Sequence, residues 1–399
     1  MQWTHRLLLA FSIVVALAGG CAAQVQIIVD AGGMARHNAP VEARLEAAHL
    51  ANPSVPVEAV LRSDDGQVVR AQVERRGEWL ELRWIEPKLQ ANERRTYTVS
   101  AMPRRSGRFH FIDGDGYRDL QHHDTPILRH VNRYDPQNHD PTHKPFHHVF
   151  RFGAVDARDP SNAFITNGPG GKFPHHRGLF FGFNKTPHGD FWHCRGVSQQ
   201  HRSYVKEQEF AGTVAARGVS VAEWVDAQGK AVVRDTRRVT TWRASGTHLI
   251  LDFEITLETL TGETFALDGD AHHSGFHFRA ANEVADREHG AAFTYPSGAK
   301  DLGNDIWGEA NWVHAAFDIA GRTYGVTHID HPSNPRPTTY STRPYGRFGA
   351  FFTHQLKPGE PLTVRYRVIV RDGSVALTEQ ALADEARGYH EPVKVLMSR

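Results

Sequence analysis

The stretch that decides the fold is Asn167-Gly-Pro-Gly-Gly-Lys-Phe-Pro-His-His-Arg-Gly-Leu-Phe-Phe-Gly-Phe183. Its first half is rich in glycine and proline, which cannot form a helix interior or a central strand, so it predicts a tight loop. The apolar run that begins at Leu179 predicts a strand buried on both faces. His175, His176 and Arg177 therefore lie where a loop enters a core strand, a place where binding and catalytic groups concentrate. The alternative is that these three side chains only cap the strand.

Two further blocks combine aromatic and titratable side chains. Asp190, Trp192 and His193 follow closely enough to come within reach of the first loop. Farther along, a strand beginning near residue 274 would point its phenylalanines to one face and His277 and Arg279 to the other. An imidazole and a guanidinium would then share a polar face, as a site built across a sheet requires. A hydrogen-bonded pair without function is the alternative interpretation.

Composition limits the possible functions. The chain has 399 residues with 46 Lys and Arg against 45 Asp and Glu, which is enough for two domains and gives no basic surface for nucleic acid. Histidine is unusually abundant at 26 residues, and imidazoles bind ligands, carry protons and hydrogen-bond to sugars. The only cysteines are Cys21 and Cys194, which excludes a disulfide framework.

Residues 1–23 are predicted to be an export signal. His5 and Arg6 precede the apolar run 7–18, which is too short to span a bilayer but suits a signal peptide. Ala18-Gly-Gly-Cys21 resembles the lipobox of bacterial lipoproteins, and ordinary cleavage after Ala23 is the alternative. No later segment is long and apolar enough to cross a membrane. We therefore expect a periplasmic protein or a lipoprotein tethered to the outer membrane through Cys21.

The rest of the chain has an all-β pattern. Short strands and turns over 24–105, including a hairpin around the turn 64–66, predict a small N-terminal β-sandwich. Residues 106–375 form a larger β domain, and 376–399 contain a helix and a tail. The polar region 104–150 holds eight histidines. We interpret most of them as part of a solvated loop, and lining of a cleft is the alternative.

The candidate residues are typical of a sugar site, where aromatic rings stack on the sugar and polar groups bind its hydroxyls. The candidate acids and bases are His176, His193, His273 and His277. The candidate substrate-binding residues are His175, Arg177, Asp190, Trp192, Arg279 and Tyr345, with Arg177 and Arg279 placed to stabilise an oxyanion.

Several other chemistries lack their motifs. The sequence contains no G-x-S-x-G, no phosphate-binding loop and no H-E-x-x-H. One alternative with a metal is a non-haem iron oxygenase that uses His328, Asp330 and a third ligand such as His354. Otherwise no metal site is predicted, and the sequence identifies no cofactor.

Several blocks resemble the PmoA-like family, catalogued as "methane oxygenase PmoA". They are Lys144-Pro-Phe-His-His148, Pro174-His-His-Arg-Gly-Leu-Phe-Phe-Gly182, Asp190-Phe-Trp192, Gly275-Phe-His-Phe-Arg279, His331-Pro-Ser-Asn334 and Arg343-Pro-Tyr-Gly346. The resemblance implies a β-supersandwich like that of galactose mutarotases, which binds sugars on a concave sheet face, often with a histidine and a carboxylate. It adds His331, Asn334 and Arg343 to the substrate-binding residues.

The sequence therefore predicts an exported all-β protein with an N-terminal β-sandwich followed by a galactose-mutarotase-like β-supersandwich. We expect it to act on a sugar or keto-sugar as a lyase, hydrolase or epimerase, with histidine as acid and base. The alternatives are a non-catalytic carbohydrate-binding lipoprotein and the iron oxygenase. The carbohydrate hypothesis depends on distant imidazoles and guanidiniums facing one hollow, and it would fail if His176, His277 and Asn334 were scattered over unrelated surfaces.

Overall fold

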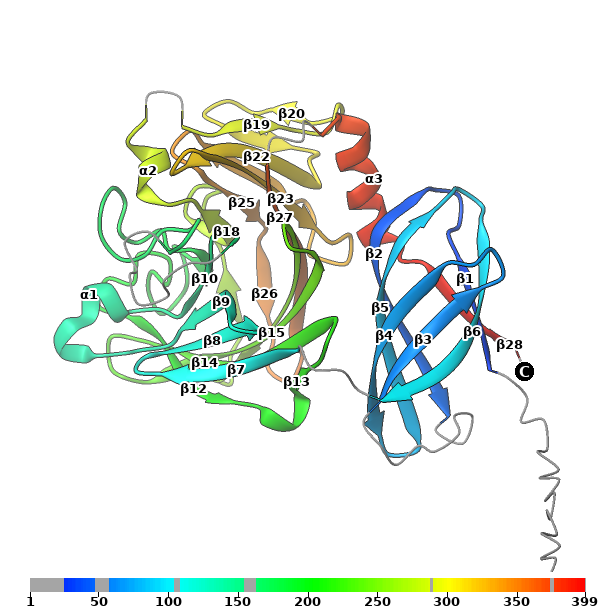
Figure 1. The fold of residues 1–399 in the computed structure, drawn as a ribbon. Helices are drawn as coiled ribbons and strands as arrows, with labels where there is room; N and C mark the ends of the chain where they lie inside the picture. The colour runs from blue at the N-terminus through cyan, green and yellow to red at the C-terminus, as the bar shows by residue number, and fades with distance from the viewer. Residues whose placement is uncertain are drawn as a thin grey trace, which may run out of the picture.

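The structure is a computed structural model that describes residues 25–46, 57–103, 108–153, 163–287, 290–373 and 377–398. The predicted export signal with Cys21 lies outside these residues. The all-β prediction is confirmed, and the strands form two units that lie side by side (Figure 1). Among the described residues, no helix is long and apolar enough to cross a membrane.

The smaller unit is one antiparallel sheet of seven strands in the order β2-β5-β4-β3-β6-β1-β28, wrapped around a common interior (Figure 1). Alternate side chains face that interior, including those of Ile27, Leu61 and Trp84. The predicted hairpin at 64–66 joins the third and fourth strands. The bounds are β1 Gln26–Asp30, β2 Arg36–Glu46, β3 Val57–Ser63, β4 Val68–Arg76, β5 Trp79–Leu89, β6 Arg94–Pro103 and β28 Lys394–Ser398.

The larger unit contains a ten-stranded sheet in the order β20-β21-β24-β25-β18-β11-β10-β9-β8-β7. Its strands are β7 Phe109–Gly114, β8 Tyr117–His122, β9 Thr125–Val131, β10 Phe146–Val149, β11 Leu179–Phe183, β18 Ser274–Arg279, β20 Lys300–Asp301, β21 Ile306–Gly308, β24 Thr339–Arg343 and β25 Arg347–Phe351.

A nine-stranded sheet packs against it, in the order β12-β14-β15-β16-β27-β23-β22-β19, with β13 beside β14. Its strands are β12 Ser198–Tyr204, β13 Phe210–Ala211, β14 Ala215–Val225, β15 Ala231–Ser245, β16 His248–Thr259, β19 Ala292–Thr294, β22 Trp312–Ile319, β23 Arg322–Asp330 and β27 Leu362–Asp372. The remaining elements are the pair β17 Phe265–Leu267 and β26 His354–Leu356, the short helices α1 His139–Thr142 and α2 Asn282–Ala285, and α3 Glu379–His390.

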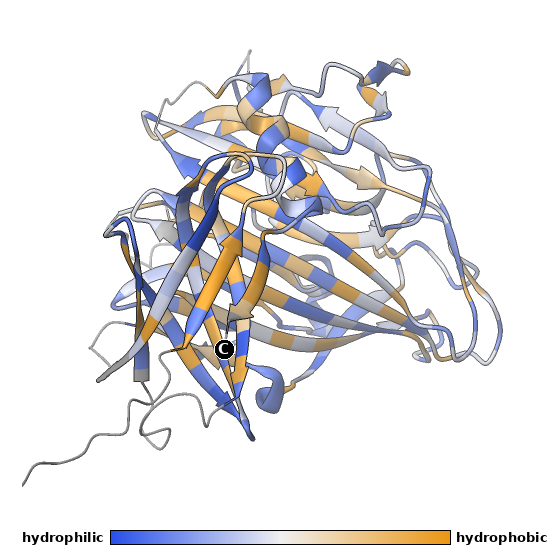
Figure 2. Cartoon of the chain, turned by 90° about the vertical axis from the view of Figure 1, so that its right-hand side faces the viewer, coloured by the Kyte–Doolittle hydropathy of each residue, from blue (hydrophilic) through white to orange (hydrophobic). Residues whose placement is uncertain are grey.

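The main core lies between these two sheets. Phe181 of β11 and Phe276 and Phe278 of β18 meet Phe253 and Val364 of the opposite sheet there. Figure 2 shows the alternation as orange and blue bands along the strands. Two large sheets packed face to face are the β-supersandwich that the sequence predicts.

The opposite face of the ten-stranded sheet carries the polar side chains of the same strands. His277 and Arg279 alternate with the core phenylalanines of β18, as predicted, and Arg347 of β25 lies beside them. The segment 184–197 crosses this face, because Trp192 packs on Phe180 with ring centroids 4.7 Å apart.

The interpretation of the histidine-rich region as mostly solvated loop is wrong. Residues 109–131 form β7, β8 and β9, and β10 follows after a short connection. The side chains of His130, His143, His147 and His148 are all buried. Their rings pack on neighbouring aromatic rings; the ring centroids of His148 and Phe164, for example, lie 4.0 Å apart.

The two units make specific contacts. The Gln72 side chain accepts hydrogen bonds from the backbone of Val214 and Ala215, at 3.3 and 3.0 Å. The Arg83 guanidinium lies 3.9 Å from the centre of the Phe210 ring. Helix α3 also contacts β2, and its Leu382 packs in an apolar cluster between the units.

Candidate active site

The loop 167–178 is held on the sheet by backbone bonds and by one guanidinium. Gly178 donates to the Asn167 carbonyl at 2.8 Å, and Arg279 donates its backbone N–H to Gly178. Arg177 donates to the carbonyls of Pro174 and Pro141, at 2.9 and 3.0 Å, and to that of Asp140. The buried Arg177 therefore fixes two loops and does not point an oxyanion donor at the surface, contrary to the prediction.

The first of two histidine–carboxylate pairs lies in the segment 184–197. Asp190 Oδ1 accepts the backbone N–H groups of Trp192 and His193, at 2.9 and 2.8 Å, which forms a tight turn. The His193 side chain folds back so that its Nδ1 lies 2.6 Å from Asp190 Oδ2. Because a carboxylate only accepts, Nδ1 carries the proton.

The second pair repeats this geometry after β17. Asp270 Oδ1 accepts from the backbone N–H of His272 at 3.0 Å and from His273 Nδ1 at 2.9 Å. The other carboxylate oxygen accepts from the Asn184 side-chain amide at 2.9 Å. Asn184 thus orients Asp270, and Asp270 orients His273.

The two pairs face each other. The ring centroids of His193 and His273 lie 5.1 Å apart, and the His175 ring lies 4.5 Å from that of His193. Reciprocal backbone bonds between Lys185 and Asp268, at 3.1 and 3.0 Å, hold the two segments together. Within the described residues Nε2 of His193 and of His273 has no partner, and both side chains are partly exposed. Each imidazole therefore keeps one ring nitrogen free, and the partly exposed surface around the two neighbouring rings is the opening of the candidate site.

Both carboxylates are held in the ionised form. Burial alone would raise the pKa of Asp190, but hydrogen bonds from His193 and the backbone hold that pKa below its ordinary value. Burial would also raise the pKa of Asp270, but the hydrogen bonds from Asn184 and His273 outweigh this effect, so the pKa of Asp270 is lowered too. Burial lowers the pKa of His273, although the Asp270 carboxylate acts to raise it. His273 is consequently neutral at neutral pH, the form that accepts a proton.

Aromatic side chains border the opening. Phe173 is 44% exposed and its ring lies 4.6 Å from that of Tyr345. Phe173 also has a positive φ of 56°, an unfavourable conformation for a bulky residue and one that recurs at functional sites. Trp192 is fully buried, so it supports the site from below and is not the sugar platform that the sequence predicts.

Beneath the opening lie two histidines with different surroundings. His277 Nε2 donates to the Ser274 carbonyl at 2.9 Å and its Nδ1 accepts from Arg347 at 3.2 Å, so both nitrogens are engaged inside the protein. His277 is therefore a positioning residue and not the proton carrier we expected. His176 is 2% exposed, and neither of its ring nitrogens has a partner. Such an orphan calls for a ligand or an ordered water molecule.

Two other predicted residues have mainly structural contacts. Arg279 is buried and donates to the carbonyls of Ala280 and Tyr345, at 2.5 and 2.7 Å, contrary to the oxyanion role predicted for it. Arg343 lies at the edge of the cluster, between Asp305 at 2.8 Å and His272 at 2.9 Å.

His331 and Asn334 do not belong to the cluster. They lie in the loop after β23, which is a strand of the other sheet, and Asn334 bonds to Asp330 and to the Arg365 backbone. His331 packs on Tyr389 of α3, with ring centroids 5.1 Å apart. The predicted hollow therefore includes His176 and His277 but not Asn334.

The iron site is not assembled either. His328 is buried and its Nδ1 lies 3.0 Å from the Tyr340 hydroxyl, while Asp330 pairs with Arg336 and Asn334. In the described ranges, no three His, Cys, Asp or Glu side chains are grouped to hold a metal ion. The residues present do not fit the predicted iron site.

Four residues of the site were not predicted from the sequence: Asp270, Asn184, Lys144 and Arg347. A signal for the carboxylate was available, because Gly-Asp-x-x-His occurs twice in the sequence, at 189–193 and 269–273. The shorter pattern Asp-x-x-His is common in a chain with this much histidine. The preceding glycine singles out the two turns that form the pairs.

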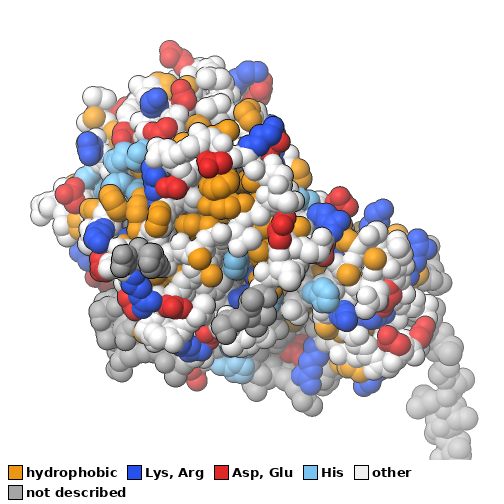
Figure 3. Space-filling view, turned by 90° about the horizontal axis from the view of Figure 1, so that it is seen from above, with side chains coloured by type: hydrophobic (Ala, Val, Ile, Leu, Met, Phe, Trp, Pro, Cys, Tyr) orange, Lys and Arg blue, Asp and Glu red, His pale blue; other side chains and the backbone are white. Residues whose placement is uncertain are grey.

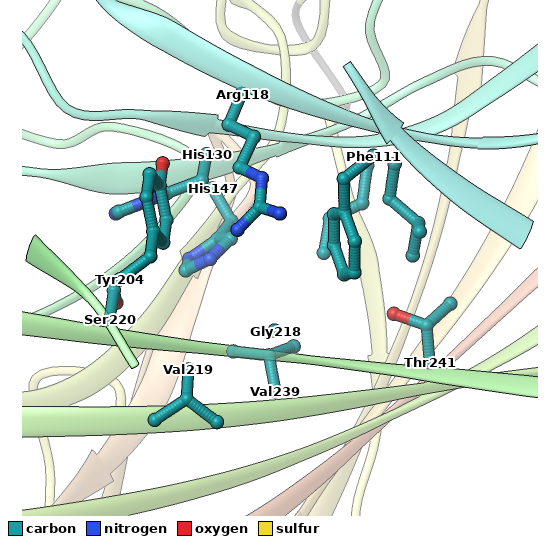
Figure 4. Close-up of a pocket in the computed structure, with 12 residues that line it drawn as sticks. Phe111, Arg118, His130, His147, Tyr204, Gly218, Val219, Ser220, Val239 and Thr241 are labelled. Carbon is teal, nitrogen blue, oxygen red and sulfur yellow. The ribbon is translucent and has the colours of Figure 1, made fainter. Parts of the chain in front are cut away.

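A second histidine cluster lies between the sheets. Figure 4 shows His130, His147 and Arg118 pointing from one sheet toward Val219 and Thr241 of the other. The cavity they line has a volume of about 40 Å³. This is room for about two or three water molecules and not for a sugar ring.

Comparisons with known proteins place the chain in a family without a described activity. No curated protein matches it. A solved structure, an alpha-mannosidase from Enterococcus faecalis V583, aligns with a TM-score of 0.40 and 10% identity over 95% of this chain and 46% of the mannosidase, so the chain spans less than half of that protein. A family model described as a family of unknown function matches residues 118–387. The chain therefore belongs to the DUF6807 family.

Proposed function

We propose that the protein is an enzyme that moves protons on a carbohydrate with its two facing histidine–carboxylate pairs. The observation that carries this proposal is the pair of imidazoles 5.1 Å apart, each oriented through Nδ1 by its own carboxylate and each with a free Nε2. An oriented imidazole beside a carboxylate is a standard means of general acid–base catalysis. Two of them at one opening can take a proton from a substrate and give one back.

The two histidines have distinct roles in this proposal. His273 is neutral, so it acts as the base, and its Asp270 partner stabilises the imidazolium that forms. His193 delivers the second proton, with Asp190 holding its ring in place. This arrangement suits an epimerase or lyase.

The aromatic border supports a sugar as the substrate. An exposed Phe173 beside Tyr345 offers flat apolar faces for the C–H side of a sugar ring, next to imidazoles that bind hydroxyl groups. The proposal also places the protein outside the cytoplasm, which rests on the sequence of residues 1–23 alone. Fractionation of cells that express the full chain tests this location.

Solvent exchange tests the activity directly. The protein is incubated in D2O with neutral aldoses, keto-sugars and sugar acids, and NMR measures deuterium entering carbon positions and any new product. We expect incorporation that falls at least 100-fold in His193→Ala and in His273→Ala. His331→Ala, outside the cluster, is the matched control and keeps wild-type exchange.

Two results contradict the proposal. Exchange that is unchanged in both variants would mean that other groups move the proton. Sugar binding without exchange or product would instead establish a non-catalytic carbohydrate-binding protein.

A further inference from the structure

Four cationic side chains lie directly beneath the candidate site, and each is at most 1% exposed. They are Lys144, Arg177, Arg279 and Arg347. In the described part of the chain, none of them has a carboxylate within ion-pair distance. Their hydrogen bonds go to neutral partners: Lys144 to the Trp192 carbonyl, Arg177 and Arg279 to loop carbonyls, and Arg347 to the Ser341 hydroxyl at 2.7 Å.

Elsewhere among the described residues, three of the four buried cations are paired with carboxylates. Arg83 lies 3.1 Å from Glu74, Arg118 lies 2.7 Å from Glu209, and Arg237 lies 2.6 Å from Asp235. Burying a charge without a counter-charge is costly, which is why such pairs are the rule. Arg36, which donates to the carbonyls of Ala31 and Glu391, is the fourth and is a single exception. Under the site four such exceptions lie together.

The burial of these charges without counter-charges also lowers their pKa values. Burial lowers the pKa of Lys144 to about 8 and that of Arg177 and of Arg279 to about 10. The carboxylates at this opening are Asp190 and Asp270, and each already binds a histidine. Four positive charges therefore lie under two negative ones. Asp140 and Asp286 act on Arg177 and Arg279 as well, but from beyond ion-pair distance, and burial still lowers both pKa values.

Each cation contacts a residue that borders the opening or one next to it in the sequence. Lys144 bonds to the carbonyl of Trp192, next to His193, and Arg177 to that of Pro174, next to His175. Arg347 lies 3.3 Å from His272, next to His273. Arg279 lies 5.1 Å from the centre of the Tyr345 ring. The positive field is thus centred under the imidazoles of the site. In the face seen in Figure 3, histidine side chains gather on one side of the larger unit.

We propose that the substrate is a sugar acid, whose carboxylate supplies the missing negative charge at this site. This inference rests on the proposed proton-transfer function and names its substrate class. The cations direct their hydrogen bonds to the protein, so they act through their field and not as a clamp that surrounds a phosphate. A single negative charge on the ligand reduces the imbalance without reversing it.

A carboxylate also gives the proton transfer its chemistry. His273 Nε2 takes the proton from the carbon next to the carboxylate, so that a C–H bond breaks and an N–H bond forms. The electron pair of the C–H bond moves into the carboxylate, which becomes an enediolate with one more negative charge. The buried cations stabilise that added charge in a dry environment. His193 then supplies a proton to the carbon or to a group leaving the next carbon.

Matched ligands test the inference. Binding of D-glucuronate, D-galacturonate and D-mannuronate is measured by calorimetry beside glucose, galactose and mannose, and beside glucose 6-phosphate. We expect at least one uronate to bind at least about ten times more tightly than its neutral counterpart. Because the attraction is electrostatic, this preference should shrink when the salt concentration rises from about 50 mM to about 500 mM. Equal or tighter binding of the neutral sugars, or a preference for the phosphate, overturns the inference.

Two variants connect the preference to the buried charge. Lys144→Met keeps the size of the side chain and removes an unpaired charge, so it should fold at least as stably as the wild type and lose most of the preference for uronate. Lys144→Arg keeps the charge and should keep the preference. A preference unchanged in Lys144→Met contradicts the inference.

The results also separate this inference from the proposed function. If neutral sugars undergo exchange that depends on His193 and His273, the proposed proton-transfer function holds and the sugar-acid substrate is ruled out. The absence of binding and exchange with every sugar would remove both.

Discussion

Each imidazole at the opening owes its orientation to the carboxylate three residues before it. Asp190 and Asp270 both use one oxygen to close a backbone turn and receive a histidine Nδ1–H on the same group. The turn therefore shapes the loop and fixes the tautomer at once. The same five-residue pattern yields two equivalent proton carriers from segments about 80 positions apart.

Removing one carboxylate should change the acidity of its histidine. Burial lowers the pKa of His273 and Asp270 opposes that effect, so Asp270→Asn should lower the pKa of His273 further. A pH titration of the ring by long-range ¹H–¹⁵N NMR measures it. Asp305→Asn, which removes a carboxylate bonded to Arg343, is the control and should leave His273 unchanged. An equal midpoint in Asp270→Asn and wild type would refute the coupling.

Individual site residues were predictable only as far as their own strand or loop determines them. The alternation that places His277 and Arg279 on one face follows from strand geometry, and it is confirmed. Their roles were not predictable, because each side chain is engaged by hydrogen-bond partners that the local alternation does not reveal. His277 bonds to Ser274 and Arg347, and Arg279 bonds to Tyr345. Burial of Trp192 likewise depends on Phe180, which lies under it only in the folded sheet.

At the scale of elements, the two turns rely on the glycine that precedes each aspartate. Gly189 has a φ of 123°, which L side chains rarely adopt. At Gly269 an added Cβ would lie 1.9 Å from Ser274 Oγ and 2.3 Å from Asn184 Oδ1. Asn184 donates to the Asp270 carboxylate, and Ser274 in turn donates to Asn184.

Gly269→Ala should therefore damage the site more than the fold. We expect a loss of about 1–3 kcal/mol in the free energy of unfolding, as for an overpacked buried position, together with a large loss of exchange activity. Urea denaturation and the D2O assay measure the two effects. Gly298→Ala, where a Cβ meets nothing within 4 Å, is the matched control. Wild-type activity in Gly269→Ala would show that the turn does not depend on this contact.

Elements with a clean hydrophobic period were predictable and those built from polar residues were not. Leu249, Leu251, Phe253, Ile255 and Leu257 all face the core from β16, as their alternation predicts. Strands β8 and β9 escaped prediction because their buried positions include Arg118, Asp119 and His130, whose charges and rings are satisfied by partners such as Arg129, Glu209 and Tyr204.

At the scale of the whole molecule, buried neutral histidines make stability depend on pH. Burial lowers the pKa of His147, His148 and His328 to about 3, whereas the unfolded chain titrates near 6.5. Above pH 6.5 their contribution is complete, and below it the unfolded chain binds more protons, so stability falls as the pH falls toward 3. Each such group costs about 1.4 kcal/mol per pH unit in that window.

Urea unfolding at pH 7.5, 6.0 and 5.0 should reveal this slope. The free energy of unfolding should be level near pH 7.5 and decrease steeply between 6.0 and 5.0. His148→Gln removes one of the three groups and should reduce the slope by about one group's share. A flat profile down to pH 5 would contradict the burial of neutral imidazoles.

The last strand, β28, should be essential to the smaller unit, since it pairs with β1 along its whole length. Val395 packs against the interior of that unit, whereas the adjacent Leu396 is 48% exposed. We expect Val395→Asp to destabilise the protein by about 1–3 kcal/mol and Leu396→Asp to be nearly neutral. Thermal unfolding of both variants measures the difference. Equal melting temperatures would mean that β28 adds little to the sheet.

The pairing of β1 with β28 also imposes an order on biogenesis. The ribosome makes β1 before the supersandwich and β28 after it, so the edge of β1 that β28 covers stays bare while the supersandwich is being synthesised. A bare strand edge invites pairing with other chains. The smaller unit, although its first strands are made before the supersandwich, is therefore completed only after it.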